Sequence, residues 1–172
     1  MPRVEEVALR PYGEGDLWLL RRVLGEPDMT RYLGGSESPA AIEARHHRYV
    51  TADPESNGLF VIVSGPEAEA VGWVGFWESE WRGELVWECG WNVVPEMQGR
   101  GVATAAAART IAAVRDRRRH RYLHAFPNVA NAASNALCRT LGFELIGAEE
   151  VEFPKGHFMR CNDWRFDLDP GL

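Results

Sequence analysis

The residues best suited to bind a ligand lie in one short segment, 98–104, with the sequence Gln-Gly-Arg-Gly-Val-Ala-Thr. A strand-like stretch that stops at Pro95 precedes it, and an alanine-rich stretch of high helical propensity follows. Glycines in such a turn let backbone N–H groups approach a ligand, because no Cβ stands in the way. The start of a helix adds unpaired donors and a partial positive charge. The segment therefore predicts an anion-binding turn, to which Arg100 adds a cation.

The spacing of the glycines narrows the choice of anion. A dinucleotide-binding turn has the pattern GxGxxG, and here Thr104 stands where the third glycine belongs. A Walker loop needs a Gly-Lys-Ser/Thr run, whereas the only lysine, Lys155, is followed by glycine. The remaining pattern is Gln-x-x-Gly-x-Ala over residues 98–103. Taken alone, this segment could also be a flexible strand-to-helix turn that binds nothing.

A second segment, residues 131–143, opens with Asn131 and ends in Leu-Gly-Phe. The first pattern resembles the Q/R-x-x-G-x-G/A signature of the GCN5-related N-acetyltransferases (GNATs). The second resembles their other signature, an asparagine that opens a helix ending in Leu-Gly-Phe. The stretches 9–16 and 88–95 also look like the branch that contains the ribosomal-protein N-terminal acetyltransferases (RimJ/RimL-like). The resemblance thus spans nearly the whole chain.

The resemblance implies an acetyl-CoA-dependent N-acetyltransferase. Such an enzyme transfers the acetyl group directly, in a ternary complex, to a primary amine of a protein N-terminus or a small molecule. The backbone at Trp91, Asn92 and Val93 and the side chain of Asn131 would hold the acetyl carbonyl and the pantetheine arm, with Asn135 near the same channel. The turn would hold the pyrophosphate, which makes the following residues cofactor-binding: Gln98, Gly99, Arg100, Gly101, Val102, Ala103 and Thr104.

The reaction needs a base for the amine and an acid for the departing thiolate. The resemblance suggests Ser134 for the thiolate and, with a one-residue gap, Glu152 as the base. Glu88 competes as the base, because a carboxylate buried beside tryptophans has a raised pKa. Each of the three could also be an ordinary surface residue. Many relatives carry a tyrosine acid where this chain has Cys138, so a catalytically degenerate GNAT-fold module that binds CoA or a partner remains the alternative function.

Two further segments have open interpretations. The stretch 25–39 contains Met29, Tyr32 and Leu33, which are unusual in a linker. The resembled family shapes its acceptor site there, so these residues predict an acceptor with a hydrophobic part, unless they only cap the core. The basic run 115–121 could contact RNA. Its position after a predicted helix favours instead cations that offset the helix dipole.

The elements that must position these residues follow a pattern typical of one mixed α/β sheet. Strands are predicted at residues 4–10, 59–63, 71–77, 85–94, 121–126, 143–152 and 158–168. Helices are predicted at residues 16–24, 38–50, 103–114 and 131–141. We expect a single domain, 1–172, with a mostly antiparallel sheet of about seven strands flanked by four helices.

The amino-acid composition limits the classes of protein to which the chain can belong. The 172 residues carry a net charge of −6, which argues against a general nucleic-acid binder. The three cysteines show neither zinc-ligand nor disulfide-framework spacing, so no metal is expected. The first ten residues lack a signal-peptide core, and no apolar stretch is long enough to cross a bilayer. The expectation is a cytoplasmic enzyme that binds acetyl-CoA and an amine, with a homodimer common in the resembled family.

Overall fold

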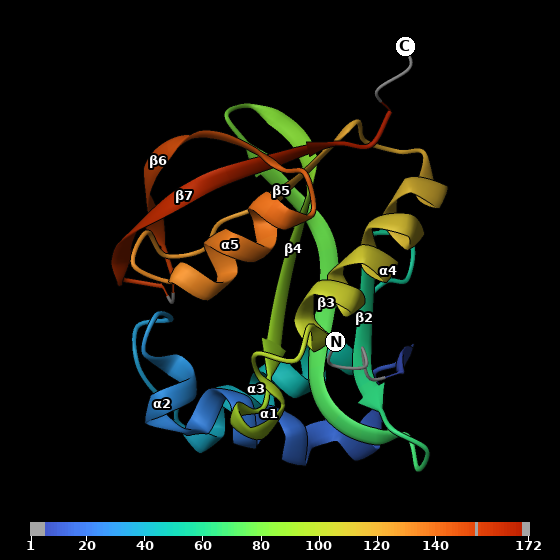
Figure 1. Cartoon of the computed structure of the whole chain (residues 1–172). Coiled ribbons are helices and arrows are strands. Elements are labelled where there is room, and N and C mark those ends of the chain that lie inside the picture. Colours follow the sequence, from blue (N-terminus) through green and yellow to red (C-terminus); the bar gives the residue numbers. More distant parts are fainter. Residues whose placement is uncertain (1–5, 154, 170–172) are drawn as a thin grey trace.

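Seven strands form one sheet in the order β1-β2-β3-β4-β5-β7-β6 (Figure 1). The computed structural model describes residues 6–153 and 155–169. Neighbouring strands are antiparallel except β4 and β5, which are parallel. The predicted mixed, mostly antiparallel sheet is thus confirmed. Its strands are β1 (Val7–Pro11), β2 (Asn57–Ser64), β3 (Glu69–Trp81), β4 (Glu84–Val93), β5 (Tyr122–Ala125), β6 (Glu144–Glu152) and β7 (Phe158–Asp167).

The four predicted helices are present as α1 (Leu17–Gly25), α3 (Pro39–Val50), α4 (Val102–Arg117) and α5 (Ala132–Thr140). Ser38 caps α3 by accepting the Ala41 N–H at 3.2 Å. One short helix, α2 (Pro27–Thr30), lies in the segment expected to be a loop. It begins at a proline, and Thr30 Oγ1 donates to the Glu26 carbonyl. A helix of one turn is too short to give a helical period in the sequence.

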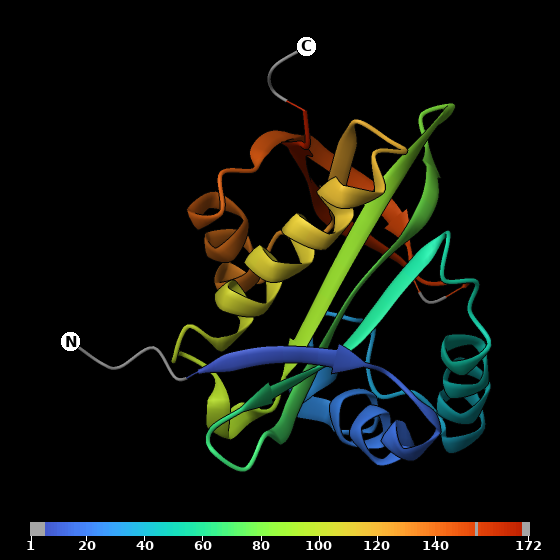
Figure 2. The same cartoon turned by 90° about the vertical axis from the view of Figure 1, so that its right-hand side faces the viewer.

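Helices cover both faces of the sheet, with α3 and α4 on opposite sides of the strands (Figure 2). Successive side chains of a strand point to opposite faces. On one face of β3, the Trp73 ring meets Tyr49 of α3 at 5.7 Å. On the other face, Phe76 lies beneath Arg117 of α4 and beside Trp87 of β4. Some tryptophans of the β3–β4 hairpin therefore lie on one face of the sheet and the others on the opposite face.

The sheet divides at its centre, between β4 and β5. These strands pair at two positions only, the second joining Glu88 to His124. β4 then continues along β3 to Val93, whereas β5 ends at Ala125 and the chain after it, 127–129, pairs with β7. Within the described residues, β4 beyond Glu88 has no strand on its β5 side. We call this divergence, between residues 89–93 of β4 and residues 126–129, the fork.

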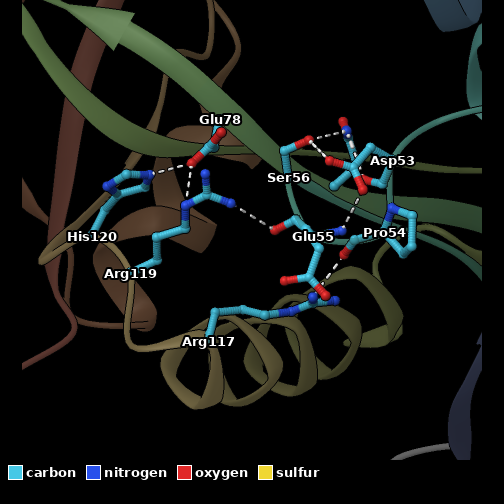
Figure 3. A network of polar contacts seen from close by, with 9 residues as sticks. Asp53, Pro54, Glu55, Ser56, Glu78, Arg117, Arg119 and His120 are labelled. Atoms are coloured by element: carbon cyan, nitrogen blue, oxygen red, sulfur yellow. Dashed lines mark hydrogen bonds and ion pairs between the residues drawn. The ribbon is translucent and has the colours of Figure 1, made fainter.

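The basic run at the end of α4 is bound to the protein itself (Figure 3). Arg117 donates to the Pro54 carbonyl at 2.7 Å, and Arg119 pairs with Glu78 at 2.9 Å. Arg115 and Arg121 make further bonds, to the Leu168 carbonyl and to Asp167. These contacts fasten α4 to the loop before β2 and to β7. They support the interpretation of the run as a helix end rather than as an RNA-contacting surface.

Candidate active site at the fork

The predicted anion-binding turn connects β4 to α4. Gly99 and Gly101 have φ of 72° and 78°, a left-handed conformation that residues with a side chain disfavour. A Cβ at either glycine would meet no atom within 4 Å, so the space beside the turn is open. In the part of the chain that the structure describes, no side chain caps α4. The first-turn amides, of Val102, Ala103 and Thr104, therefore have no partner within the helix.

Gln98 fixes this turn to the fork. Its side-chain amide donates to the Val93 carbonyl at 2.9 Å and lies 3.7 Å from Met29 Sδ. The first contact holds the turn against the end of β4, next to Asn92. The second joins the predicted cofactor turn to the predicted acceptor segment. Residues that the sequence separates by about seventy positions thus meet at one point.

The start of α5 forms the other side of the fork. Asn131 is its N-cap, and the side-chain oxygen accepts the Ser134 N–H at 3.2 Å. From β4, the indole N–H of Trp91 donates to Ser134 Oγ at 3.2 Å. Because the indole is the donor in this bond, the Ser134 hydroxyl keeps its own proton for another acceptor. Three predicted site residues are therefore brought together across the fork.

Asn135, the next predicted residue on α5, is buried and is fully hydrogen-bonded to protein. Its Nδ2 donates to the carbonyls of Asn128 and Asn131 at 3.0 and 2.8 Å. Its Oδ1 accepts from Asn162 Nδ2 and from Trp164 Nε1, both at 2.8 Å. Two donors and two lone pairs are thereby used. The side chain holds α5 to β7; its place beside the cofactor channel stays a prediction.

Replacing Asn135 with alanine is expected to lower the free energy of unfolding by about 3 kcal/mol, because one buried and three partly buried groups lose a partner. The melting temperature should fall by about 10 °C in a domain of this size. Asn162→Ala, which removes one of the four bonds, is the matched control and should cost about 1 kcal/mol. Equal losses in the two variants, measured by thermal melts, would contradict the central role of Asn135.

Glu88 lies at the point where β4 parts from β5. Its pKa is raised because burial disfavours the charged form, while hydrogen bonds from Ser79 and Trp77 and the charge of His124 partly offset that effect. This is the direction expected for a carboxylate beside tryptophans. A carboxylate with this property can accept a proton from an amine.

Glu152 occupies a different environment, at the exposed end of β6. Its Oε1 accepts the Gly156 N–H at 2.8 Å and closes the turn between β6 and β7. The neighbouring ring of Phe153 lies 5.6 Å from the Arg45 guanidinium, so this turn packs against α3. Of the two candidate bases, Glu88 is the one that lies at the fork.

Cys138 of α5 is fully buried in the core. Burial raises the pKa of its thiol to about 12. The side chain therefore packs as a small apolar group. Burial also raises the pKa of the Cys89 thiol on β4, and the nearby Cys138 thiol adds to this effect.

The predicted acceptor segment lies beside α1. Met29 and Leu33 pack against the core, which supports the capping interpretation in part, and Tyr32 is half-buried. On the α3 side of the sheet, the rings of Trp77 and Trp73 cover Gly90 of β4, where a Cβ would meet them at 3.2 and 3.8 Å. Aromatic surface therefore lies next to the fork.

Two residues at this site were missed in the sequence. His124 of β5 pairs with Asp163 of β7 at 2.6 Å, and both side chains are buried. A histidine within a short strand is easily taken for an ordinary polar position. The signal that could have found the pair is a histidine and an aspartate alternating with apolar residues in two adjacent buried strands.

Residues 6–153 and 155–169 contain neither a metal-binding cluster nor a membrane-spanning helix. No group of three or more His, Cys, Asp or Glu side chains in these ranges is arranged to hold a metal ion. No helix there is long and apolar enough to span a membrane.

Solved structures share this architecture over nearly their full length. A ribosomal-protein-S5-alanine acetyltransferase from Vibrio fischeri superposes with a TM-score of 0.78 at 17% identity, over 96% of this chain and 95% of its own. A spermidine N-acetyltransferase from Vibrio cholerae, in complex with CoA and spermine, gives 0.77 at 19% identity, over 95% and 96%. An aminoglycoside acetyltransferase in complex with coenzyme A gives 0.75 at 17%, over 94% and 95%. At these identities the likeness establishes the fold.

The sequence comparison establishes the family. No curated protein matches the chain. The family model described as an acetyltransferase (GNAT) domain matches residues 6–144, which include the β4–β5 fork, the glycine turn and α5. The chain therefore belongs to the GNAT acetyltransferase family.

Proposed function

We propose that this protein is an acetyl-CoA-dependent N-acetyltransferase that acetylates a primary amine by direct transfer in a ternary complex. The observation that carries the proposal is the fork, which opens beside the uncapped first turn of α4. An open strand edge suits an extended amide-containing arm, and a helix start suits an anion. Solved relatives with the same fold hold CoA or acetyl-CoA.

The residues present fit that cofactor. The amides of residues 99–104 would bind the pyrophosphate, with Arg100 as an added cation, while Gln98 keeps the turn in place. The backbone of Trp91, Asn92 and Val93 would bind the pantetheine arm and polarise the acetyl carbonyl, opposite Asn131. When bound, acetyl-CoA supplies an activated acetyl thioester beside Glu88 and Ser134.

The side chains at the fork divide the proton chemistry between them. Glu88 would accept a proton from the acceptor ammonium, which leaves a neutral nucleophilic amine. The Ser134 hydroxyl, held by the Trp91 indole, would donate a proton toward the leaving sulfur. The fork itself orients the reactants, which supplies a large share of such a rate enhancement.

The acceptor class is part of the proposal. The structural relatives include enzymes for spermidine, aminoglycosides and ribosomal proteins. Met29, Tyr32 and Leu33 lie on the α1 side, and the Trp73 and Trp77 rings lie near the fork. We infer an amine attached to an apolar portion, as at a protein N-terminus of the RimJ/RimL type.

Replacing Ser134 with alanine is expected to lower kcat by about 10–100-fold, because the leaving thiolate loses its proton donor. Acetyl-CoA affinity, measured by calorimetry, should change less than about threefold, since the hydroxyl acts on the sulfur as it leaves. The control is Ala136→Ser, a change at an exposed position of the same helix, which should leave both values unchanged. An unchanged kcat in Ser134→Ala would remove this residue from the site.

A binding module without transferase activity is the second candidate, because Cys138 replaces the tyrosine acid and is fully buried. Calorimetric titration with acetyl-CoA tests what both candidates share. Absence of binding would contradict both. Binding accompanied by acetylation of spermidine, an aminoglycoside or an N-terminal peptide supports the enzyme, with the product located by mass spectrometry.

A further inference from the structure

A buried histidine–carboxylate pair lies directly beside Glu88. His124 Nδ1 and Asp163 Oδ1 are 2.6 Å apart, and their side chains are 6% and 1% exposed. The Trp81 indole N–H donates to the other Asp163 oxygen at 3.0 Å, and Phe126 stacks on the imidazole. Both side chains are therefore fixed in place and shielded from water. A charge in such surroundings needs an oppositely charged partner.

The strand order places the imidazole between two carboxylates. Glu88 is on β4, His124 is at the same register on β5, and Asp163 is on β7, the next strand. Side chains in register on adjacent parallel strands share a face, with the strands about 4.8 Å apart. His124 is thus the direct neighbour of Glu88, while Asp163 lies one strand further away.

Apart from His124, the side chains that act on the pKa of Glu88 carry no charge. From β3, the facing polar side chains are neutral: Trp77 and Ser79. Burial raises the pKa of two buried thiols, those of Cys89 and Cys161, and the charge of Glu88 raises both further. Glu150 acts on Cys161 in the same direction. The charge of His124 favours the ionised form of Glu88.

We propose that His124 and Asp163 are positioning residues of the transfer site. Asp163 fixes the His124 ring beside Glu88, and the charge of this ring favours the carboxylate form of Glu88, which can take the proton of the acceptor ammonium. The protons balance. One passes from the ammonium to Glu88 before attack and then to water, and the proton that the nitrogen loses after attack restores the one that Ser134 gives to the sulfur, which leaves as a thiol. The inference rests on the proposed role of Glu88.

The ionisation of Glu88 can be measured without turnover. Carboxyl ¹³C NMR of protein labelled at glutamate follows its titration, and the signal is assigned by its loss in Glu88→Gln. In His124→Gln and in Asp163→Asn the titration midpoint should move up by about one pH unit or more, because the imidazole is removed in the first variant and loses its charged partner in the second. A midpoint that stays in place in both variants would overturn the proposal.

A second histidine–carboxylate pair provides the control (Figure 3). His120 Nε2 and Glu78 Oε1 are also 2.6 Å apart, and this imidazole is 12% exposed. Glu78 follows Trp77, the register partner of Glu88, so it points to the opposite face of the sheet. His120→Gln should therefore leave the Glu88 midpoint unchanged. A shift as large as in His124→Gln would indicate general loosening and contradict the proposal.

The use of two variants keeps the test valid if one of them misfolds. Asp163→Asn is nearly isosteric and keeps an oxygen for the Trp81 indole, so it decides the question if His124→Gln loses its cooperative melt. Once an acceptor is known, the acidic limb of the kcat–pH profile should move with the NMR midpoint. If no amine in the panel is acetylated, the proposed function fails, while the NMR result still decides whether the pair acts on Glu88.

Discussion

Glu88→Gln is expected to lower kcat by about 10²–10⁴-fold, because it removes the group that takes the proton of the amine. The affinity for acetyl-CoA should change little, since the amide keeps the size of the side chain and the fork backbone is untouched. Steady-state kinetics measures the loss of kcat, and calorimetry measures the affinity for acetyl-CoA, so the two effects are separated. The acidic limb of the kcat profile should also disappear in the variant.

Stability provides an internal check on this variant. Glu88 binds its proton more tightly in the folded protein than in the unfolded chain, because its folded pKa is raised. Its contribution to stability therefore falls as pH rises from the ordinary glutamate pKa through the raised one. At neutral pH, Glu88→Gln should melt at the temperature of the wild type or above it. A large drop in melting temperature would attribute lost activity to misfolding instead.

Glu152→Gln is the matched comparison, since it makes the same chemical change at the other candidate base. Glu152 is exposed and closes the β6–β7 turn through Gly156, so kcat should change by less than about threefold, as for most surface substitutions. A loss of kcat in Glu152→Gln with none in Glu88→Gln would reverse the assignment of the base.

Gly101→Glu should weaken acetyl-CoA binding by about 100-fold or more. Two effects add: a side chain at φ of 78° costs about 1–2 kcal/mol, and a carboxylate at the start of α4 competes with and repels the pyrophosphate. Calorimetric titration measures the loss. The helix should remain folded, because the introduced side chain points into open space.

Gly83→Glu separates the ligand effect from the backbone effect. Gly83 has φ of 80° with no atom within 4 Å of a Cβ. A side chain introduced there meets the same backbone strain and the same open space as at Gly101. It lies in the β3–β4 turn, at the end of β4 remote from the glycine turn (Figure 1). This variant should lose stability and keep its affinity. Equal affinity losses at both glycines would contradict an anion site at Gly101.

The parts of the site that the sequence predicted are those encoded locally. Gly99 and Gly101 occupy left-handed positions between a strand end and a helix start, and both signals lie within a few residues. Asn131 likewise caps the helix that it precedes. Strand alternation and helical propensity were sufficient for the sheet and the four longer helices, since each depends on a single continuous segment.

The remaining features depend on contacts between distant segments. His124 and Asp163 meet because β5 and β7 are neighbours, although they are 39 residues apart in the sequence. Asn135 has the appearance of a ligand-binding polar residue, and only the approach of β7 shows that its hydrogen bonds are used. The short helix α2 has too few residues for a period. Neighbouring strands, rather than local propensity, decide such features.

Amine-dependent release of CoA thiol from acetyl-CoA tests the central claim most directly. Wild-type protein should release thiol in step with acetylation of at least one primary amine among spermidine, an aminoglycoside and N-terminal peptides, and Glu88→Gln should abolish that release. Acetyl-CoA binding without amine-dependent thiol release from any of these acceptors would contradict an acetyltransferase and leave a CoA-binding module.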